Sequence, residues 1–152
     1  METKTILQKK HVVLVPCLLR PKKKKPQTAP QRERLSAFLE TGRLYHPLCR
    51  QAFVEQVAIG YYAYEQQVEF RTWALAAAYA GAFGANAVER ADFSYTMAVW
   101  QLSQRVGYGL EQTVVNGPTG RQQNIAKEMM DLTDINLWTR QGVAQWLSSI
   151  GY

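Results

Sequence analysis

The chain has 152 residues, 47% of them hydrophobic and 20% charged, with a formal net charge of +6 at neutral pH. This length and composition exclude a chain that is disordered throughout and are typical of one globular domain. Two cysteines and two histidines are too few for a disulfide framework or a His-rich metal site, so we expect no metal or other cofactor. The low cysteine content also favours a reducing compartment, which is the cytoplasm, or the nucleus in a eukaryote.

The positive charge lies at the start of the chain. Residues 1–34 carry ten Lys or Arg against two Glu, a net charge of +8, whereas residues 35–152 carry eight basic and ten acidic side chains, a net charge of −2. The stretch RPKKKKPQTAP, residues 20–30, has the composition of a solvated linker that its like charges keep extended. We therefore predict a basic arm and linker over residues 1–30 and a helical domain over residues 31–152.

The apolar run HVVLVPCLL, residues 11–19, is short for a signal peptide. Arg20 and four lysines follow where a small-residue cleavage site would stand, which argues against secretion. The β-branched residues favour a short strand at 11–15, and Pro16 confines it to an edge or an end. As an alternative to an all-helical fold, this strand pairs with QTVV, residues 112–115, in a two-stranded ribbon.

Two helices are predicted after the linker. The first begins at Pro30, places Leu35, Phe38 and Leu39 on one side, and ends before Gly42, which we expect to be its left-handed cap. The second begins at Pro47, passes or bends at Gly60, and continues through QQVEFRTWALAAAYAGAFGANA. Apolar residues recur in it at three- and four-residue steps: Leu48, Phe53, Val54, Val57, Ala58, Tyr61 and Tyr62.

Three further helices follow. Asp92 is expected to cap FSYTMAVWQLSQRVG, whose apolar stripe is Tyr95, Val99, Leu102 and Val106, with Gly107 and Gly109 at its end. A helix over 122–132 places Ile125, Met129 and Leu132 on one face. Thr133 or Asp134 is expected to cap the last helix, whose large apolar residues are Trp138, Trp146, Leu147 and Ile150. The predicted fold is therefore all-α, a compact bundle of five to six helices with a basic, partly extended N-terminal arm.

Two stretches of the body have unusual compositions. The small residues of WALAAAYAGAFGANA, residues 73–87, let helix backbones approach closely, so we predict a buried core helix, ahead of an interface with a partner and of a membrane span. Aromatic residues cluster in YYAYEQQVEFRTW, residues 61–73, where large side chains with a polar end suit either a core or an interface. We take Tyr61, Tyr64 and Trp73 as the candidate partner-binding residues.

No motif indicates a reaction. NGPTGRQQ, residues 116–123, lacks the lysine and spacing of a phosphate-binding loop, so a turn that starts a helix explains it. Cys49 and His46 could form a nucleophile and base, but Pro47 separates them and no third residue orients the imidazole. The carboxylates have spacings typical of solvated helix faces. We therefore assign no catalytic residue and expect no enzymatic activity.

The basic arm carries the functional hypothesis. Its candidate nucleic-acid-binding residues are Arg20, Lys22, Lys23, Lys24, Lys25, Arg32 and Arg34. Cations in such a run bind phosphates without reading sequence. We predict a non-enzymatic binding or assembly protein that contacts other protein subunits, or a second copy of itself, through its helical body and nucleic acid through its arm. The alternatives are a structural subunit whose arm threads onto a neighbour, and a small enzyme.

Overall fold

The computed structural model describes residues 33–60 and 67–152, and within them it contains five α-helices, one short 3-10 helix and four strands. In chain order the elements are α2 (Leu35–Gly42), β1 (Val54–Ile59), β2 (Gln67–Thr72), α3 (Ala74–Phe83), η2 (Ala85–Val88), α4 (Tyr95–Val106), β3 (Val114–Asn116), β4 (Gln122–Asn124), α5 (Ile125–Asp134) and α6 (Arg140–Ser149). The strands form two small antiparallel sheets, so the fold is mixed and the all-α prediction is wrong.

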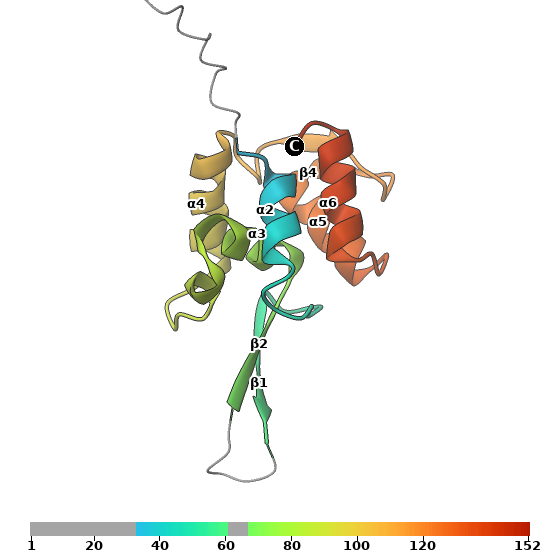
Figure 1. Ribbon diagram of the computed structural model, residues 1–152. Helices are drawn as coiled ribbons and strands as arrows, with labels where there is room; N and C mark the ends of the chain where they lie inside the picture. Colours follow the sequence, from blue (N-terminus) through green and yellow to red (C-terminus); the bar gives the residue numbers. More distant parts are fainter. Residues whose placement is uncertain (1–32, 61–66) are drawn as a thin grey trace, which may run out of the picture. The chain divides into compact units, whose positions relative to one another are not determined.

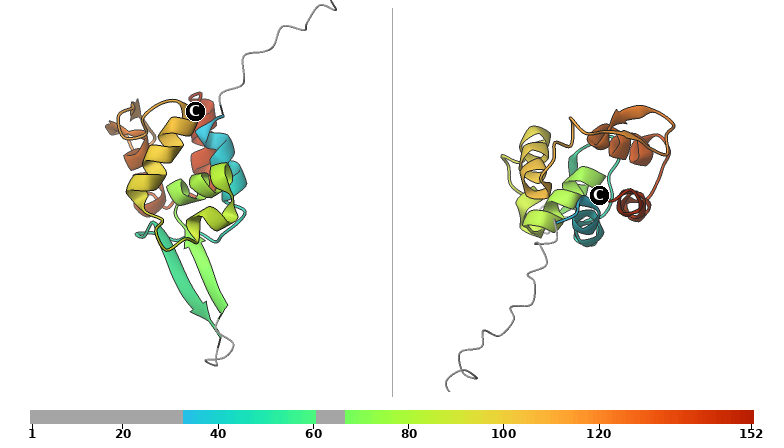
Figure 2. Two further views of the ribbon diagram at one scale, coloured as in Figure 1. Left: turned by 90° about the vertical axis from the view of Figure 1, so that its left-hand side faces the viewer. Right: turned by 90° about the horizontal axis from the view of Figure 1, so that it is seen from above.

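The main error concerns the long helix predicted from Pro47. Residues 47–53 belong to no helix or strand apart from a single bridge at Leu48, and β1 then pairs with β2 so that Val54 lies opposite Thr72 and Ile59 opposite Gln67. We call these two strands the ribbon. The ribbon projects away from the helices, as Figure 1 and the left view of Figure 2 show. Its end with the Val54–Thr72 pair is the one joined to them. Neither strand has a continuous buried face, so the alternation of apolar and polar residues that marks a half-buried strand is missing.

The small-residue segment forms a core helix, as predicted. Six residues of α3 have no exposed surface, and the helix contacts α2, α4 and α5. Gly42 and Gly81 allow the approach of α2, because a Cβ on Gly81 would lie 1.8 Å from the carbonyl oxygen of Phe38. Gly42 is therefore the last residue of α2, where it permits close packing, and not a left-handed cap beyond the helix.

Helix α4 presents the predicted stripe to the core. Val99, Leu102 and Val106 are buried, and Tyr95 is half-buried. The helix begins later than predicted, because Ser94 and not Asp92 accepts a hydrogen bond from the main-chain nitrogen of Met97. Gly107 ends the helix in the left-handed conformation, with φ of 86°.

The C-terminal part contains the second sheet and two helices. β3 pairs with β4, so the helix predicted from 122 begins only at Ile125, where Asn124 is the cap. Ile125, Met129 and Leu132 lie in the core, as predicted. Thr139 caps α6, whereas Thr133 and Asp134 are the last residues of α5.

Residues Arg32–Tyr152 form one compact unit. Its first helix meets the last residue of the chain, because the main-chain nitrogen and the hydroxyl of Ser36 both donate to the carbonyl oxygen of Tyr152, each at 3.0 Å. The predicted arm over 1–30 and its strand at 11–15 lie outside the described residues. In the alternative topology that strand pairs with residues 112–115, but in the described part of the chain β3 has β4 as its partner.

Candidate binding groove

The structure separates the predicted site residues. Arg20, Lys22, Lys23, Lys24, Lys25 and Arg32, together with Tyr61 and Tyr64, lie outside the described residues. Arg34 is exposed just before α2. Trp73 is only 3% exposed, and its Nε1 donates to Oγ1 of Thr133 at 2.7 Å. It is therefore a core residue, and its position does not support the prediction of an exposed partner-binding side chain.

Most cations of the compact unit already have partners. The ion pairs are Arg43–Glu40, Arg71–Glu69, Arg90–Asp92, Arg105–Glu33, Arg121–Asp131 and Lys127–Asp131. Arg50 and Arg140 donate to main-chain carbonyl oxygens. Among residues 33–60 and 67–152, only Arg34 has neither an ion-pair nor a hydrogen-bond partner. This surface therefore offers few free cations to a polyanion.

Cys49 and His46 do not form a nucleophile–base pair. The Cys49 thiol is buried and donates to the carbonyl oxygens of Ala52 and Arg71, at 3.2 and 3.4 Å. Burial raises the pKa of this thiol, which favours its unreactive protonated form. The His46 imidazole instead pairs through Nε2 with the Glu89 carboxylate, at 3.1 Å. The two side chains thus have separate structural roles.

The NGPTGR turn between β3 and β4 is closed by a buried carboxylate. Glu128 of α5 has no exposed surface and accepts hydrogen bonds from the main-chain nitrogen and the hydroxyl of Thr119, at 2.9 and 2.8 Å. Gln123 also donates to it, at 2.5 Å. The Glu128 carboxylate thus accepts the hydrogen bonds that Thr119 would otherwise donate to an anionic ligand of this turn. The turn has a structural role, which agrees with its interpretation as a simple turn.

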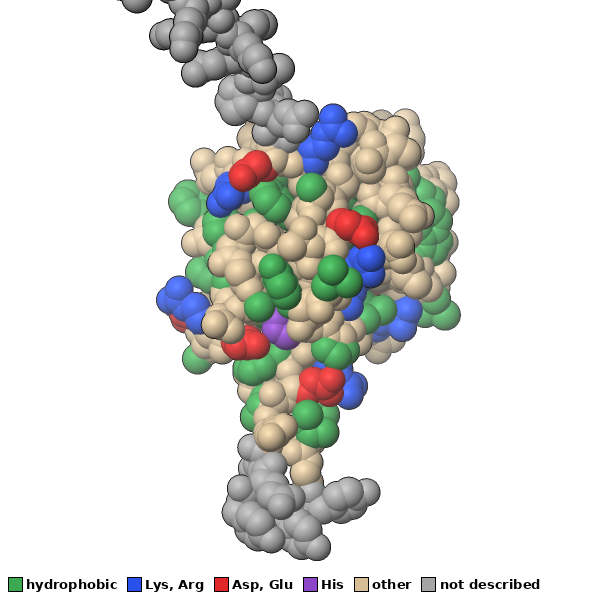
Figure 3. All heavy atoms as spheres, viewed as in Figure 1, with side chains coloured by type: hydrophobic (Ala, Val, Ile, Leu, Met, Phe, Trp, Pro, Cys, Tyr) green, Lys and Arg blue, Asp and Glu red, His purple; other side chains and the backbone are tan. Residues whose placement is uncertain are grey.

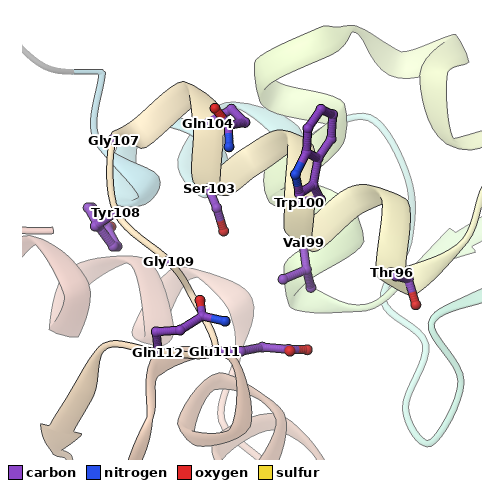
Figure 4. Close-up of a pocket in the computed structure, with 10 residues that line it drawn as sticks. All are labelled: Thr96, Val99, Trp100, Ser103, Gln104, Gly107, Tyr108, Gly109, Glu111 and Gln112. Carbon is purple, nitrogen blue, oxygen red and sulfur yellow. The ribbon is translucent and has the colours of Figure 1, made fainter.

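A groove that sequence analysis did not identify runs beside α4 (Figure 4). It has a volume of about 530 Å³, which lies in the range of ligand sites in proteins. Thr96, Trp100 and Gln104 are spaced four residues apart and therefore share one side of the helix. Val99 and Ser103 extend from α4 toward the chain that follows it. One wall of the groove is thus a well-capped helix.

The loop over residues 107–112 forms the other wall. Gly107 turns the chain back, and Leu110 anchors the loop with a fully buried side chain. The main-chain nitrogen of Leu110 donates to the Ser103 hydroxyl at 3.1 Å, and its carbonyl oxygen accepts from Ala126 at the start of α5. The loop is therefore fixed to both neighbouring helices, and the groove exists before any ligand binds.

The lining of the groove favours cations over anions. Glu111 is the one charged residue among those that line it, and the described residues provide it with no ion-pair partner. Burial, followed by the nearby Glu111 carboxylate, raises the pKa of Tyr95 to about 12. Glu111 thus has a neutral phenol as its neighbour, and no cation among the described residues compensates its negative charge.

Trp100 gives the groove an aromatic edge. Its side chain is 64% exposed, which is unusual for a tryptophan and typical of a binding surface. In Figure 4 it lies at the opposite edge of α4 from Glu111 and Gln112. A ligand that contacts both edges must therefore be extended. The sequence signal was the stripe of Thr96, Trp100 and Gln104 beside the core stripe.

Comparisons with known protein families, with curated proteins and with solved structures found no match to this chain. Within residues 33–60 and 67–152, no three His, Cys, Asp or Glu side chains gather in a way that could hold a metal ion. No helix in this part of the chain is long and apolar enough to cross a membrane.

Proposed function

We propose that this protein is a non-enzymatic binding and assembly protein whose compact unit holds an extended basic segment of a partner protein in the α4 groove. The observation that carries the proposal is the uncompensated carboxylate of Glu111, in a preformed groove that Trp100 borders. A guanidinium or ammonium group satisfies this carboxylate, and the face of a tryptophan attracts the same groups. No chemical step is assigned to the groove.

The magnitudes indicate moderate affinity. An exposed ion pair contributes about 0–1 kcal/mol, and a cation over an exposed aromatic ring contributes about 0.5–1 kcal/mol. Neither contact holds a partner alone. The hydroxyl of Thr96 and the carboxamides of Gln104 and Gln112 can add hydrogen bonds along the groove. We therefore expect a segment of several residues to bind with a dissociation constant of roughly 1 to 100 μM.

The test compares two probes with the full-length protein. One is an acetylated peptide of alternating arginine, serine and alanine residues, and the other has citrulline in place of each arginine, which keeps the shape and removes the charge. The arginine peptide should shift the indole N–H signal of Trp100 in a saturable way and bind roughly tenfold more tightly than the citrulline peptide. Equal binding of both peptides, or no saturable shift, contradicts the proposal.

Two variants and two matched controls locate the contact. Glu111→Gln should reduce the preference for arginine over citrulline. Trp100→Ala should weaken both peptides, and its binding is followed through the main-chain amide signal of Glu111 because the indole is absent. Glu55→Gln changes an exposed carboxylate of the ribbon, and Ile135→Ala shortens a side chain that is 65% exposed, close to the value for Trp100. Neither control should alter either affinity.

We also propose that the N-terminal basic segment contacts nucleic acid. This part of the proposal is supported by the net charge of +8 over residues 1–34 together with the internal pairing of almost every cation in the compact unit. Binding to a polyanion releases condensed counterions, so affinity falls with salt. Replacing Lys22, Lys23, Lys24 and Lys25 by glutamine should lower the slope of log affinity against log salt by roughly 3.

Measurements on single-stranded and duplex probes of scrambled sequence at several salt concentrations give this slope. Binding that is absent at low salt for DNA and RNA alike, or a slope that the four substitutions leave unchanged, contradicts the nucleic-acid part of the proposal. The peptide experiment is a separate test, because it varies Glu111 and Trp100 of the groove and leaves the four lysines unchanged.

A further inference from the structure

The outer edge of β2 in the ribbon carries main-chain groups that have no partner in the described part of the chain. At Thr72 this edge is occupied, because its nitrogen donates to the carbonyl oxygen of Pro47 at 2.8 Å and its carbonyl oxygen accepts from Cys49 at 3.2 Å. Leu48 thereby forms a single parallel bridge with Thr72. The chain itself shows that this edge pairs with an extended segment.

The edge is unpaired beyond that bridge. In an antiparallel pair, successive residues direct their main-chain groups alternately toward the partner strand and away from it. Because the groups of Thr72 point outward, those of Phe70 and Val68 point outward too. The intervening Arg71 and Glu69 face β1, where they lie opposite Glu55 and Val57. Two N–H groups and two carbonyl groups are therefore available in a row.

An apolar surface flanks the same edge. Val68 is 53% exposed, and the nearby turn before Leu48 exposes Leu44 by 72% and Tyr45 by 47%. The His46 ring of this turn meets the Phe70 ring edge-on, with centroids 6.5 Å apart, so the turn and the strand are neighbours. In Figure 3 hydrophobic side chains lie on the surface where the ribbon meets the helices. Side chains of an added strand would find apolar neighbours here.

We propose that the outer edge of β2 receives an extended strand of a different protein, with apolar side chains at alternate positions. The apolar residues would lie on the face of Val68 and Phe70, and a polar or basic residue would lie opposite Glu69. Strand addition of this kind obtains affinity from main-chain hydrogen bonds and specificity from alternate side chains. The inference is independent of the α4 groove, because the two sites share no residue.

A second copy of this chain fits the edge poorly. If two β2 strands paired so that Val68 lay opposite Phe70 of the other copy, Glu69 would lie directly opposite its equivalent, and like charges in that position are destabilising. If Phe70 lay opposite its own equivalent, Val68 would need the main-chain groups of Thr72, which the Pro47–Cys49 segment already occupies. These two registers are therefore disfavoured.

The test uses a displayed library of random peptides of about ten residues, long enough to add a strand of ordinary length. The library is selected on the full-length protein. We expect enrichment of peptides with apolar residues at alternate positions, and slower amide exchange at Val68 and Phe70 when a selected peptide is bound. No enrichment over the starting library, or enriched peptides without this alternation, would overturn the proposal.

Proline variants show which edge is used. Val68→Pro and Phe70→Pro each remove one outward N–H without removing a bond between β1 and β2, so each should weaken a selected peptide by at least about fivefold. Gln56→Pro makes the same change on the outer edge of β1 and should leave affinity unchanged. Chemical shifts of β1 confirm that the ribbon is intact in each variant.

If Gln56→Pro alone weakened the selected peptide, the assignment to β2 would be overturned. Concentration-dependent dimerisation of the protein that the same β2 variants abolish would also overturn the proposal.

Discussion

A Cβ built on Gly42 would lie 1.6 Å from the carbonyl oxygen of Ala77. No side chain can be accommodated at that distance, so α2 and α3 must be in direct backbone contact at this point. Gly81 makes the reciprocal contact one turn further along α3. The alanines of α3 are required for the same reason, because larger residues would separate two helices that share the centre of the core.

Gly42→Ala is therefore expected to destabilise the protein by roughly 3 kcal/mol, the upper part of the range for overpacking a core, and Gly81→Ala by a similar amount. Gly142→Ala is the matched control, since it lies within α6 and its Cβ would come no closer than 3.3 Å to another atom. Urea unfolding gives the free energy of unfolding of each of the three variants. A loss below about 1 kcal/mol in both Gly42→Ala and Gly81→Ala would contradict the packing described here.

Glu128→Gln tests the buried carboxylate that closes the β3–β4 turn. The carboxamide keeps one acceptor oxygen but directs an NH₂ group at Thr119 or Gln123, which are themselves donors. We expect a loss of about 1–3 kcal/mol in the free energy of unfolding, with faster amide exchange at Thr119. The exposed Glu55→Gln change should cost less than about 0.5 kcal/mol. Equal stability of the two variants would contradict the structural role of Glu128.

Tyr95 should titrate with a pKa of about 12, because burial and, to a smaller extent, the neighbouring Glu111 carboxylate disfavour its charged form. A phenol whose pKa is higher in the folded than in the unfolded state stabilises the protein fully below the unfolded value of about 10, and this contribution is lost as the pH rises toward 12. Glu111→Gln should lower the pKa of Tyr95 and leave it above the ordinary value, since burial is the larger cause.

The ring carbon shifts of Tyr95, assigned by comparison with Tyr95→Phe, report this titration directly. Thermal unfolding over the same pH range should show a smaller loss of stability in Tyr95→Phe than in the unmodified chain. An unchanged titration of Tyr95 in Glu111→Gln would mean that the two side chains do not interact.

Cys49 should react slowly with iodoacetamide, because burial raises the pKa of its thiol and the thiolate is the reactive form. The measurement uses a Cys17→Ser chain so that Cys49 alone is labelled. At about pH 8 the native protein should be alkylated at least tenfold more slowly than the same chain in urea. Equal rates would show that the thiol is accessible, and would reopen its consideration as a nucleophile.

Sequence periodicity identified the helices that have one strongly apolar side. Val99, Leu102 and Val106 of α4 recur at helical spacing and face the core of the protein. The alanines of α3 indicated a buried helix because their side chains are small. The ends of helices were less predictable, because Ser94 and Thr139 compete with equally suitable caps nearby. Local sequence offers several oxygen acceptors for a cap, and tertiary packing decides which one is used.

The ribbon escaped prediction for a different reason. Phe53, Val54 and Val57 satisfy helical spacing, and no face of β1 is buried deeply enough to impose the alternation of a strand. β4 is polar and only three residues long.

The α4 groove was not predicted because Glu111 and Trp100 belong to different walls, and only the loop fixed by Leu110 brings these walls together.

The bonds between Ser36 and Tyr152 close the compact unit in a way that the linear sequence conceals. A short peptide link from Tyr152 to residue 33 would make the backbone continuous through this contact. The chain could then be opened at the exposed residues 90–92 before α4 or in the loop that precedes α6. Such circular permutants would carry new ends at chosen distances from the groove. They would thus convert one fold into a set of fusion scaffolds whose attachment points differ while the core stays the same.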